Sequence, residues 1–316
     1  MKRVGWIIVG ICLLFLFLAI TSQVYSEKQT KKVKQISVIL YGNNLDRWQS
    51  LKQGMEQAGK DYGGEVNYVL MSSEYNKEEQ LLLIQREIDN NADAIILAAN
   101  DASMDLSSIR LPSKKYPILC VESGVENQDI ALVSADNYKM GERLAMEVID
   151  QENEIAKIAI VMDHQQRDSV KARYEGFYNK IMEKFDNFTF WRREKGENRS
   201  IIFAQRELTE EAVDVVVALD NSSLEAVIDA ALNLNKKVKI YGIANSDKAV
   251  YYLDNGKIKT LIYQDEFSIG YIGMKSVLGG ASYKKEKMSH FIKYHVVYDT
   301  TLYLPENQRV LFPFVK

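Results

Sequence analysis

Polar and charged side chains stand directly after several apolar runs of this sequence. The first run, Ile36–Tyr41, is followed by GNNLDRW at residues 42–48, which brings amide, carboxylate and guanidinium groups next to an indole ring. A sugar presents a rim of hydroxyl groups and an apolar C–H face, and these side chains match both surfaces. The same pattern after later runs predicts a ligand site made by Asn44, Arg47, Trp48, Asn100, Glu122, Arg173, Asp220 and Gln264.

Some of these positions have a purely structural alternative. Trp48 is also compatible with a buried helix residue that packs on a sheet, although the functional role is favoured. Polar residues after a strand often cap the next helix. Asn221 and Ser222 are such candidate caps, which weakens the case for Asn221 as a ligand residue more than the case for Asp220.

Catalytic and metal chemistry finds little support in the sequence. Glu122 and Asp220 could act as paired carboxylates in glycoside hydrolysis, but they are better explained as acceptors for ligand hydroxyls. Nucleophile-elbow, phosphate-loop and dinucleotide-binding motifs are missing from the sequence. The histidines at 164, 290 and 295 have no metal-ligand spacing. We therefore expect no enzyme activity, no metal and no cofactor.

The elements that would position these residues alternate along the chain. Short runs rich in Ile, Val and Leu are typical of parallel strands covered on both faces, and helical patterns between them indicate crossovers. The predicted helices include 45–58, 77–90, 169–183 and 223–234. The predicted strands are 36–41, 66–71, 94–98, 118–121, 130–133, 158–162, 188–191, 215–219, 238–243 and 258–263.

The second half of the chain repeats the first. Residues 36–55 align without a gap on residues 158–177, so that Gly54 matches Gly176, and DAIILAAND from Asp93 matches DVVVALDN from Asp214. Two matched units in the same order predict two similar α/β lobes. Ligands of open parallel sheets bind beyond the carboxyl ends of the strands, so a ligand would lie between the two lobes.

Composition and charge narrow the class of protein. The chain has 316 residues, of which 47% are hydrophobic, and its formal net charge is −3. Without a basic excess, nucleic acid is not an expected partner. Cys12 lies in the N-terminal apolar run and Cys120 in a predicted strand, so we expect no disulfide.

The N-terminus has the character of a targeting segment. Lys2 and Arg3 precede an uncharged run, 4–26, whose apolar heart is 6–20. This pattern predicts export, either with a signal peptide that is cleaved after Ser26 or with residues 1–26 kept as a membrane anchor. Residues 27–34 would form a solvated tether.

Beyond these patterns, the chain resembles the type I periplasmic binding protein family, especially its ribose and galactose branch and the ligand-sensing domain of LacI-type repressors. The similarity rests on an ordered set of segments, among them ILYGNNLDRWQSLKQG, VSADNYKMGERLA, KARYEGF and LIYQDEFSIGYIG. The resemblance implies two doubly wound parallel-sheet lobes joined by a hinge that the chain crosses three times, preceded here by an N-terminal hydrophobic helix. It places Ala135, Asp136 and Asp265 in the hinge. The N-terminal lobe would comprise 35–135 and 265–290, and the C-terminal lobe 136–264 and 291–316.

The resemblance also implies roles for the site residues. Trp48 would stack on a sugar ring, Asn44 and Arg47 would lie in the first ligand loop, and Glu122 would bind a hydroxyl group. Arg173, Asp220 and Gln264 match further ligand contacts of the family. The chain departs from the family at Glu122-Ser123 and at Ala244-Asn245, where an aspartate is common, so a modified sugar, another polyol or an unrelated small molecule stays open as the ligand.

We therefore expect an extracytoplasmic solute-binding protein that delivers a small polar ligand to an ABC permease. The alternative is a membrane-anchored accessory that reports the ligand to a sensor histidine kinase or a chemoreceptor. An uncleaved N-terminal segment would favour the alternative. A helix-turn-helix does not precede the first lobe in the sequence, which argues against a DNA-binding repressor.

Overall fold

The computed structural model describes residues 33–72, 76–162, 166–193, 200–279 and 290–311. The chain divides into two compact units, residues 1–34 and 35–316, and the second unit holds the fold described below. The predicted N-terminal helix and nearly all of the tether lie outside the described residues. Among the described helices, none combines the length and the apolar character that a membrane crossing needs.

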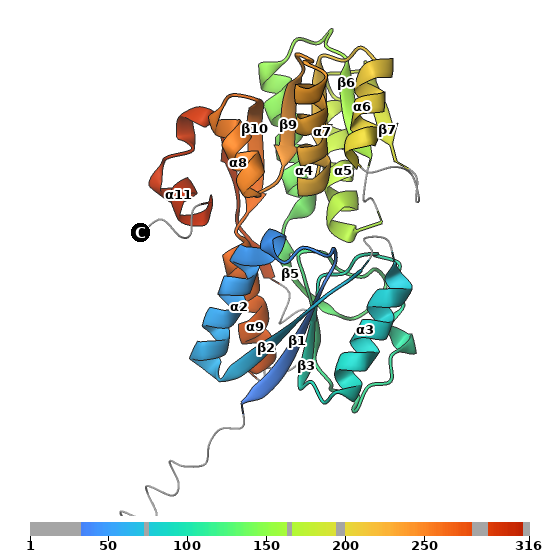
Figure 1. The fold of residues 1–316 in the computed structure, drawn as a ribbon, viewed down its shortest axis with the longest axis vertical. Helices are drawn as coiled ribbons and strands as arrows, with labels where there is room; N and C mark the ends of the chain where they lie inside the picture. The colour runs from blue at the N-terminus through green and yellow to red at the C-terminus, as the bar shows by residue number, and fades with distance from the viewer. Residues whose placement is uncertain (1–32, 73–75, 163–165, 194–199, 280–289, 312–316) are drawn as a thin grey trace, which may run out of the picture. The chain divides into compact units, whose positions relative to one another are not determined.

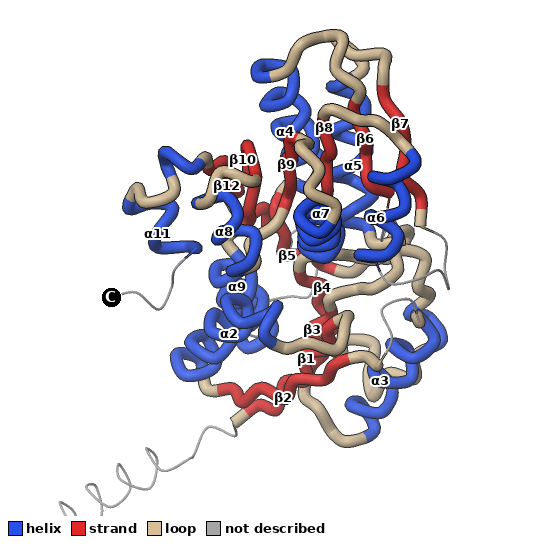
Figure 2. The backbone as a smooth tube through the Cα atoms, turned by 45° about the horizontal axis from the view of Figure 1, so that its top comes forward, coloured by secondary structure: helices blue, strands red, loops and turns tan. Residues whose placement is uncertain are grey.

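The second unit contains two six-stranded sheets (Figures 1 and 2). In the first sheet, the pairs β11–β5, β5–β4, β4–β3 and β3–β1 are parallel. In sheet order its strands are β11 (His290–Ile292), β5 (Ala131–Ala135), β4 (Ile118–Val121), β3 (Ala94–Leu97), β1 (Lys34–Leu40) and β2 (Gly64–Leu70).

The second sheet repeats this order with the second half of the chain. Its strands are β12 (Tyr294–Val297), β10 (Ile258–Gln264), β9 (Lys239–Ile243), β8 (Val215–Ala218), β6 (Ile158–Met162) and β7 (Phe188–Arg192). Strand β6 takes the place of β1, and β8 takes the place of β3, as the sequence repeat predicts. The two similar parallel-sheet lobes are therefore confirmed, and all ten predicted strands are present within one or two residues of their expected bounds.

One strand pair differs from the expected parallel arrangement. Strand β12 runs antiparallel to β10. The cause is the chain path, because β11 ends in the first sheet at Ile292 and β12 begins in the second sheet at Tyr294. Strand β11 is an edge strand and runs parallel to β5. The chain leaves it directly into the other lobe, so it enters the second sheet in the direction opposite to β10.

Each sheet is covered on both faces, which explains the continuous apolar runs of its strands. In the first lobe, α2 (Gln49–Tyr62) and α9 (Glu266–Leu278) pack on one face, through residues such as Met55 and Met274. Helix α3 (Lys77–Asp89) packs on the other face with Ile84 and Ile88, next to the 3₁₀ turn η2 (Leu106–Ser108). Both faces of every central strand are thus removed from water.

The second lobe is built in the same way. Helices α4 (Asn137–Gln151) and α5 (Asp168–Ile181) cover one face. The other face is covered by four helices, which include a C-terminal helix that the sequence did not predict: α6 (Ser200–Glu210), α7 (Asn221–Asn233), α8 (Asp247–Asp254) and α11 (Pro305–Leu311). Figure 1 shows α6, α7 and α8 on the side of the second lobe that faces the viewer.

Glycine allows the paired helices of each lobe to cross in backbone contact. A Cβ atom on Gly54 of α2 would collide with the carbonyl oxygen of Phe267 in α9, and one on Gly270 of α9 would collide with that of Leu51. In the second lobe, Gly176 of α5 lies equally close to the carbonyl oxygen of Tyr138, and Gly141 of α4 to that of Arg173. The matched glycines at 54 and 176 therefore serve the same packing need.

The hinge helices begin directly at the crossings between the sheets. Asp136 caps α4 by accepting a hydrogen bond from the Lys139 amide at 3.1 Å, and Asp265 caps α9 by accepting one from the Ser268 amide at 2.9 Å. The carbonyl of Ala135 accepts hydrogen bonds from the hydroxyl of Ser134 and the side-chain amide of Asn137. At both crossings, after β5 and after β10, a side-chain cap therefore fixes the start of the helix that follows the strand.

The candidate caps of α7 were wrong. Helix α7 begins at Asn221, and its cap is the preceding residue, Asp220, whose carboxylate accepts from the Ser223 amide at 3.1 Å. Asn221 instead exchanges hydrogen bonds with Asn245 at the end of β9. Strand β8 ends one position before its predicted end, and α7 begins two positions before its predicted start.

We expect Gly176→Ala to lower stability by about 3 kcal/mol, because the added methyl group collides with backbone that cannot move independently. For a chain of this size, that corresponds to a fall of about 5 °C in melting temperature, measured by circular dichroism. Gly256→Ala is the control, since Gly256 has φ +65° and open space around it, so its substitution costs about 1–2 kcal/mol of backbone strain. Equal falls in both variants would contradict the close crossing.

Candidate functional site

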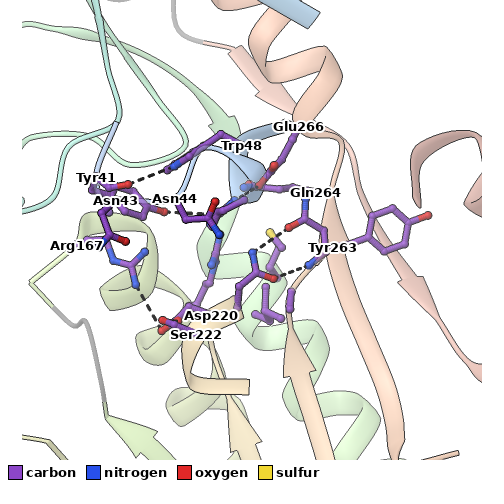
Figure 3. A pocket seen from close by; sticks show the side chains of 18 residues that line it. Tyr41, Asn43, Asn44, Trp48, Arg167, Asp220, Ser222, Tyr263, Gln264 and Glu266 are labelled. Carbon is purple, nitrogen blue, oxygen red and sulfur yellow. Dashed lines mark hydrogen bonds and ion pairs between the residues drawn. The ribbon is translucent and has the colours of Figure 1, made fainter. Parts of the chain in front are cut away.

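A cavity of about 110 Å³ lies beyond the carboxyl ends of the strands of both sheets. Its wall takes residues from the β1–α2 loop, from α4 and α5, from the ends of β8 and β9, and from the hinge passage after β10 (Figure 3). The residues with polar side chains in this wall are Tyr41, Asn43, Asn44, Arg47, Trp48, Arg167, Arg173, Asp220, Asn221, Ser222, Asn245, Tyr263, Gln264 and Glu266.

Trp48 is held rigidly at the start of the first-lobe wall. Its indole nitrogen donates a hydrogen bond to the Tyr41 carbonyl at 3.2 Å, and its ring meets the Tyr41 ring edge to face at 4.8 Å. The guanidinium of Arg47 lies 4.2 Å from the centre of the Trp48 ring. The side chain of Trp48 is fully buried, and the Arg47 guanidinium lies over one face of its ring.

Glu122 occupies a strained position at the end of β4. Its φ is +63°, a left-handed conformation that costs a residue with a Cβ atom about 1–2 kcal/mol. The side chain is 1% exposed, and its carboxylate accepts hydrogen bonds from the Tyr41 hydroxyl at 2.9 Å and from Arg173 at 3.2 Å. A strained residue that aims a buried charge at the other lobe is typical of a functional position.

Arg173 joins three elements behind the cavity. Besides Glu122, its guanidinium donates to the side chain of Asn137 at 2.8 Å and to the carbonyl of Leu219 at 3.1 Å. These contacts connect the end of β4 in the first lobe with the hinge helix α4 and the end of β8 in the second.

Arg167 crosses the cavity from the second lobe. Its guanidinium lies 4.5 Å from the centre of the Tyr41 ring and 3.5 Å from the carboxylate of Asp220. Figure 3 shows it directed along the wall between these two partners. Since Arg47 pairs with Glu266 at 3.0 Å, each of the three guanidinium groups in the wall has a carboxylate partner.

These charges shift the protonation equilibria of the site. Burial raises the pKa of the Tyr41 hydroxyl to about 12, and the neighbouring Glu122 carboxylate adds to the rise. Burial alone would raise the pKa of Glu122, but Arg173, Arg167 and Arg47 outweigh it and hold that pKa below its ordinary value. Burial would also lower the pKa of Arg47, yet the charge of Glu266 raises it. The Glu122 carboxylate and the Arg47 guanidinium therefore stay charged near neutral pH.

Two buried acceptor atoms in the wall lack a partner among the described residues. They are Oε1 of Gln264, the last residue of β10, and Oε2 of Glu266, the first residue of α9. Both residues line the cavity, and their side chains are 5% and 2% exposed. An acceptor buried without a donor is costly, so these two atoms are candidates for accepting a hydrogen bond from a ligand.

The predicted site residues fall into three groups in the structure. Six of them lie in the cavity wall: Asn44, Arg47, Trp48, Arg173, Asp220 and Gln264. Glu122 lies one contact behind the wall, bonded to Tyr41 and Arg173. Asn100 lies elsewhere, buried beside Met71 and Gln80 in the first lobe. Which of them bind ligand stays a prediction.

The sequence did not predict Tyr41, Ser222, Asn245 or Glu266 as ligand residues, although all of them line the cavity. Ser222 was considered only as a helix cap, and Asn245 only as a departure from the family. Tyr41 was counted as the apolar end of a strand, although its hydroxyl bonds to Glu122. Glu266 could have been predicted as a wall residue, because it lies two residues after Gln264, at the end of a predicted strand. Arg167 is another polar residue after a strand, β6, and residues 163–165 of the same loop lie outside the described part of the chain.

Comparison with known proteins identifies the family to which this chain belongs. The model of the periplasmic binding protein domain matches residues 36–284, more than half of the chain. The chain belongs to the periplasmic binding protein family. No curated protein sequence matches it.

Several solved structures share this periplasmic binding protein fold. One is a carbohydrate transporter solute-binding protein from Agrobacterium radiobacter in complex with D-arabinose, with a TM-score of 0.77 and 19% identity over 89% of this chain and 100% of that one. Another is GanP, a glucose-galactose binding protein from Geobacillus stearothermophilus, with a TM-score of 0.76 and 17% identity over 87% and 100%. A solute-binding protein from Agrobacterium vitis with bound D-fucose has a TM-score of 0.75 and 19% identity over 88% and 100%. At these identities the similarity establishes the fold.

We expect Glu122→Gln to lower the stability of this periplasmic binding protein at pH 7 by about 3–5 kcal/mol, because it leaves Arg173 buried without a carboxylate. The folded-state pKa of Glu122 is lowered, so the wild-type advantage is present above its ordinary value of 4.5 and disappears as the pH falls through the lowered pKa. Melting temperatures at pH 7, 5, 4 and 3 would check this.

The control for this prediction is Glu126→Gln. Glu126 also pairs with a cation of the other lobe, Lys171, but both side chains are more than a third exposed, so we expect little change. A constant difference between wild type and Glu122→Gln at all pH values would contradict the assigned role of Glu122.

Proposed function

We propose that this chain is an extracytoplasmic solute-binding protein that closes its two lobes on one small, polyhydroxylated ligand of the sugar class and delivers it to an ABC transporter. The observation that carries the proposal is the cavity itself, whose wall is shared by both lobes and by the hinge passage at residues 264–266. A ligand placed there would contact every part that moves when the lobes separate.

The size and chemistry of the cavity support a small, single-ring ligand. A cavity of roughly 150 Å³ holds a benzene molecule, and this cavity measures about 110 Å³. A monosaccharide is therefore a better match than an oligosaccharide, with slight parting of the lobes to admit it. Exposed amides at Asn43 and Asn44 and the unpartnered acceptors at Gln264 and Glu266 suit a rim of hydroxyl groups.

Family membership supports transport rather than catalysis. The similar structures that hold D-arabinose and D-fucose are solute-binding proteins, and we extend that role to this chain. The two carboxylates that could have acted as a catalytic pair are both engaged, since Glu122 binds Arg173 and Tyr41, and Asp220 caps α7 beside Arg167. A general acid needs a proton at working pH, and the lowered pKa of Glu122 opposes that role.

The periplasmic family also implies a location outside the cytoplasmic membrane. Whether the chain is secreted or anchored depends on residues 1–32, which lie outside the described part. Delivery to a permease is favoured over the sensor-accessory alternative, because the similar structures that carry sugars are transport components.

The test is a thermal-shift screen of the purified full chain against sugars, polyols, nucleosides and amino acids. A ligand that binds only the folded protein stabilises it by mass action, by about 2.7 kcal/mol when its concentration is a hundred times Kd. The melting temperature rises as a result. We expect stabilisation by one or more monosaccharides. Stabilisation by amino acids or nucleosides alone would refute the sugar class, and a screen without any hit would refute solute binding.

We expect Gln264→Leu to weaken binding of the best sugar from that screen at least tenfold, about 1.4 kcal/mol, measured by calorimetry. The melting temperature without ligand should stay equal or rise, because the lost Oε1 atom has no partner in the described structure. Gln80→Leu is the matched control. Gln80 donates to the Ala98 carbonyl and accepts from the Asn100 amide outside the cavity wall, so its loss should lower stability and leave affinity unchanged. Unchanged affinity in Gln264→Leu would remove this residue from the site.

A further inference from the structure

Glu266 differs from the other carboxylates around the cavity in keeping one oxygen available. Its Oε1 accepts from Arg47 at 3.0 Å, while Oε2 is buried and unpartnered within the described residues. By contrast, Asp220 bonds to the amide and hydroxyl of Ser223, to Ser222 and to Arg167. Figure 3 shows Glu266 and Gln264 on the same side of the cavity, opposite Tyr41 and Arg167.

The charges of the wall balance in pairs when Glu122, directly behind the wall, is included. Arg47 is matched by Glu266, Arg167 by Asp220 and Arg173 by Glu122. An anionic ligand would therefore enter as an unpaired charge and lie beside the buried, unpartnered Oε2 of Glu266. A buried charge without a partner costs several kcal/mol, whereas a hydroxyl group can donate to Oε2 without adding charge.

We infer that Glu266 sets the charge selectivity of the cavity: its Oε2 accepts a hydrogen bond from a ligand hydroxyl, and its pairing with Arg47 excludes sugar acids in favour of the uncharged sugar. The inference rests on the proposed location of the ligand. Glu266 is not one of the positions, 122–123 and 244–245, at which the sequence departs from the family.

The same pairing predicts how selectivity would change. Glu266→Gln keeps the shape of the side chain but leaves Arg47 without a counter-charge, so a carboxylate on the ligand would restore the balance. Arg47→Gln leaves Glu266 without a counter-charge, so an ammonium group on the ligand would restore it. The double variant removes both charges and returns to a neutral wall.

The experiment compares matched ligands of one scaffold: D-galactose, D-galacturonate and D-galactosamine, and the corresponding D-glucose series. Affinities or melting shifts are measured for wild type, the two single variants and the double variant. Wild type and the double variant should prefer the neutral sugar at least tenfold over its acid. Glu266→Gln should shift that ratio at least tenfold toward the uronate, and Arg47→Gln should shift the preference toward the amino sugar.

Glu152→Gln is the matched control for loss of a buried carboxylate. Glu152 is 8% exposed and pairs with Lys239 at 2.6 Å in the second lobe, outside the cavity wall, so selectivity should not change. Acetate at matched ionic strength is a probe that needs no sugar. It should stabilise Glu266→Gln but not wild type.

Failure of the inference and failure of the proposed function are distinguishable. If no sugar stabilises wild type, the sugar class is refuted, while the acetate response of Glu266→Gln still decides the role of Glu266. Wild-type binding of a uronate as tight as that of its neutral sugar would overturn the inference. So would folded Glu266→Gln and Arg47→Gln proteins that keep the wild-type order of preference.

Discussion

The buried carboxylate of Glu122 holds the two lobes together at the point where their strands end. It accepts hydrogen bonds from Tyr41 in its own lobe and from Arg173 in the other, and it is almost completely removed from water. A buried ion pair is stable only when both partners are kept in place. Arg173 meets that condition by also binding Asn137 and Leu219, which lie on the hinge helix and after β8. Through these contacts one ion pair connects the end of β4 with the hinge helix α4 and with the end of β8.

The fold supplies this contact through an internal repeat. Both lobes order their strands alike, and both pack the helix after the first strand against a hinge helix through glycine. Arg173 lies on α5, one turn before Gly176, so the backbone contact between α4 and α5 fixes the arginine relative to Asn137. The close packing of α4 on α5 therefore fixes where the positive charge of Arg173 lies at the cavity.

The strands could be predicted from sequence because burial on both faces produces continuous apolar runs, and the two-lobe arrangement followed from the matched segments at 36–55 and 158–177. The site was harder to predict, because a position after a strand does not determine where the side chain points. Asn100 follows β3 but turns toward Met71 beneath the loop. Tyr41 follows β1 as an apolar residue, yet its hydroxyl reaches Glu122. Long-range pairing of this kind has no local signal in a single sequence.

The chain passes between the lobes at three places, after β5, after β10 and between β11 and β12. Each lobe is consequently assembled from distant parts of the chain, and a single cut in the backbone at one passage leaves two covalent connections. The halves of the molecule are therefore not separable by nicking, and neither could be released during synthesis as a finished piece. The first lobe is complete only after β11 has emerged from the ribosome, so neither lobe can finish folding before almost the whole chain has been synthesised.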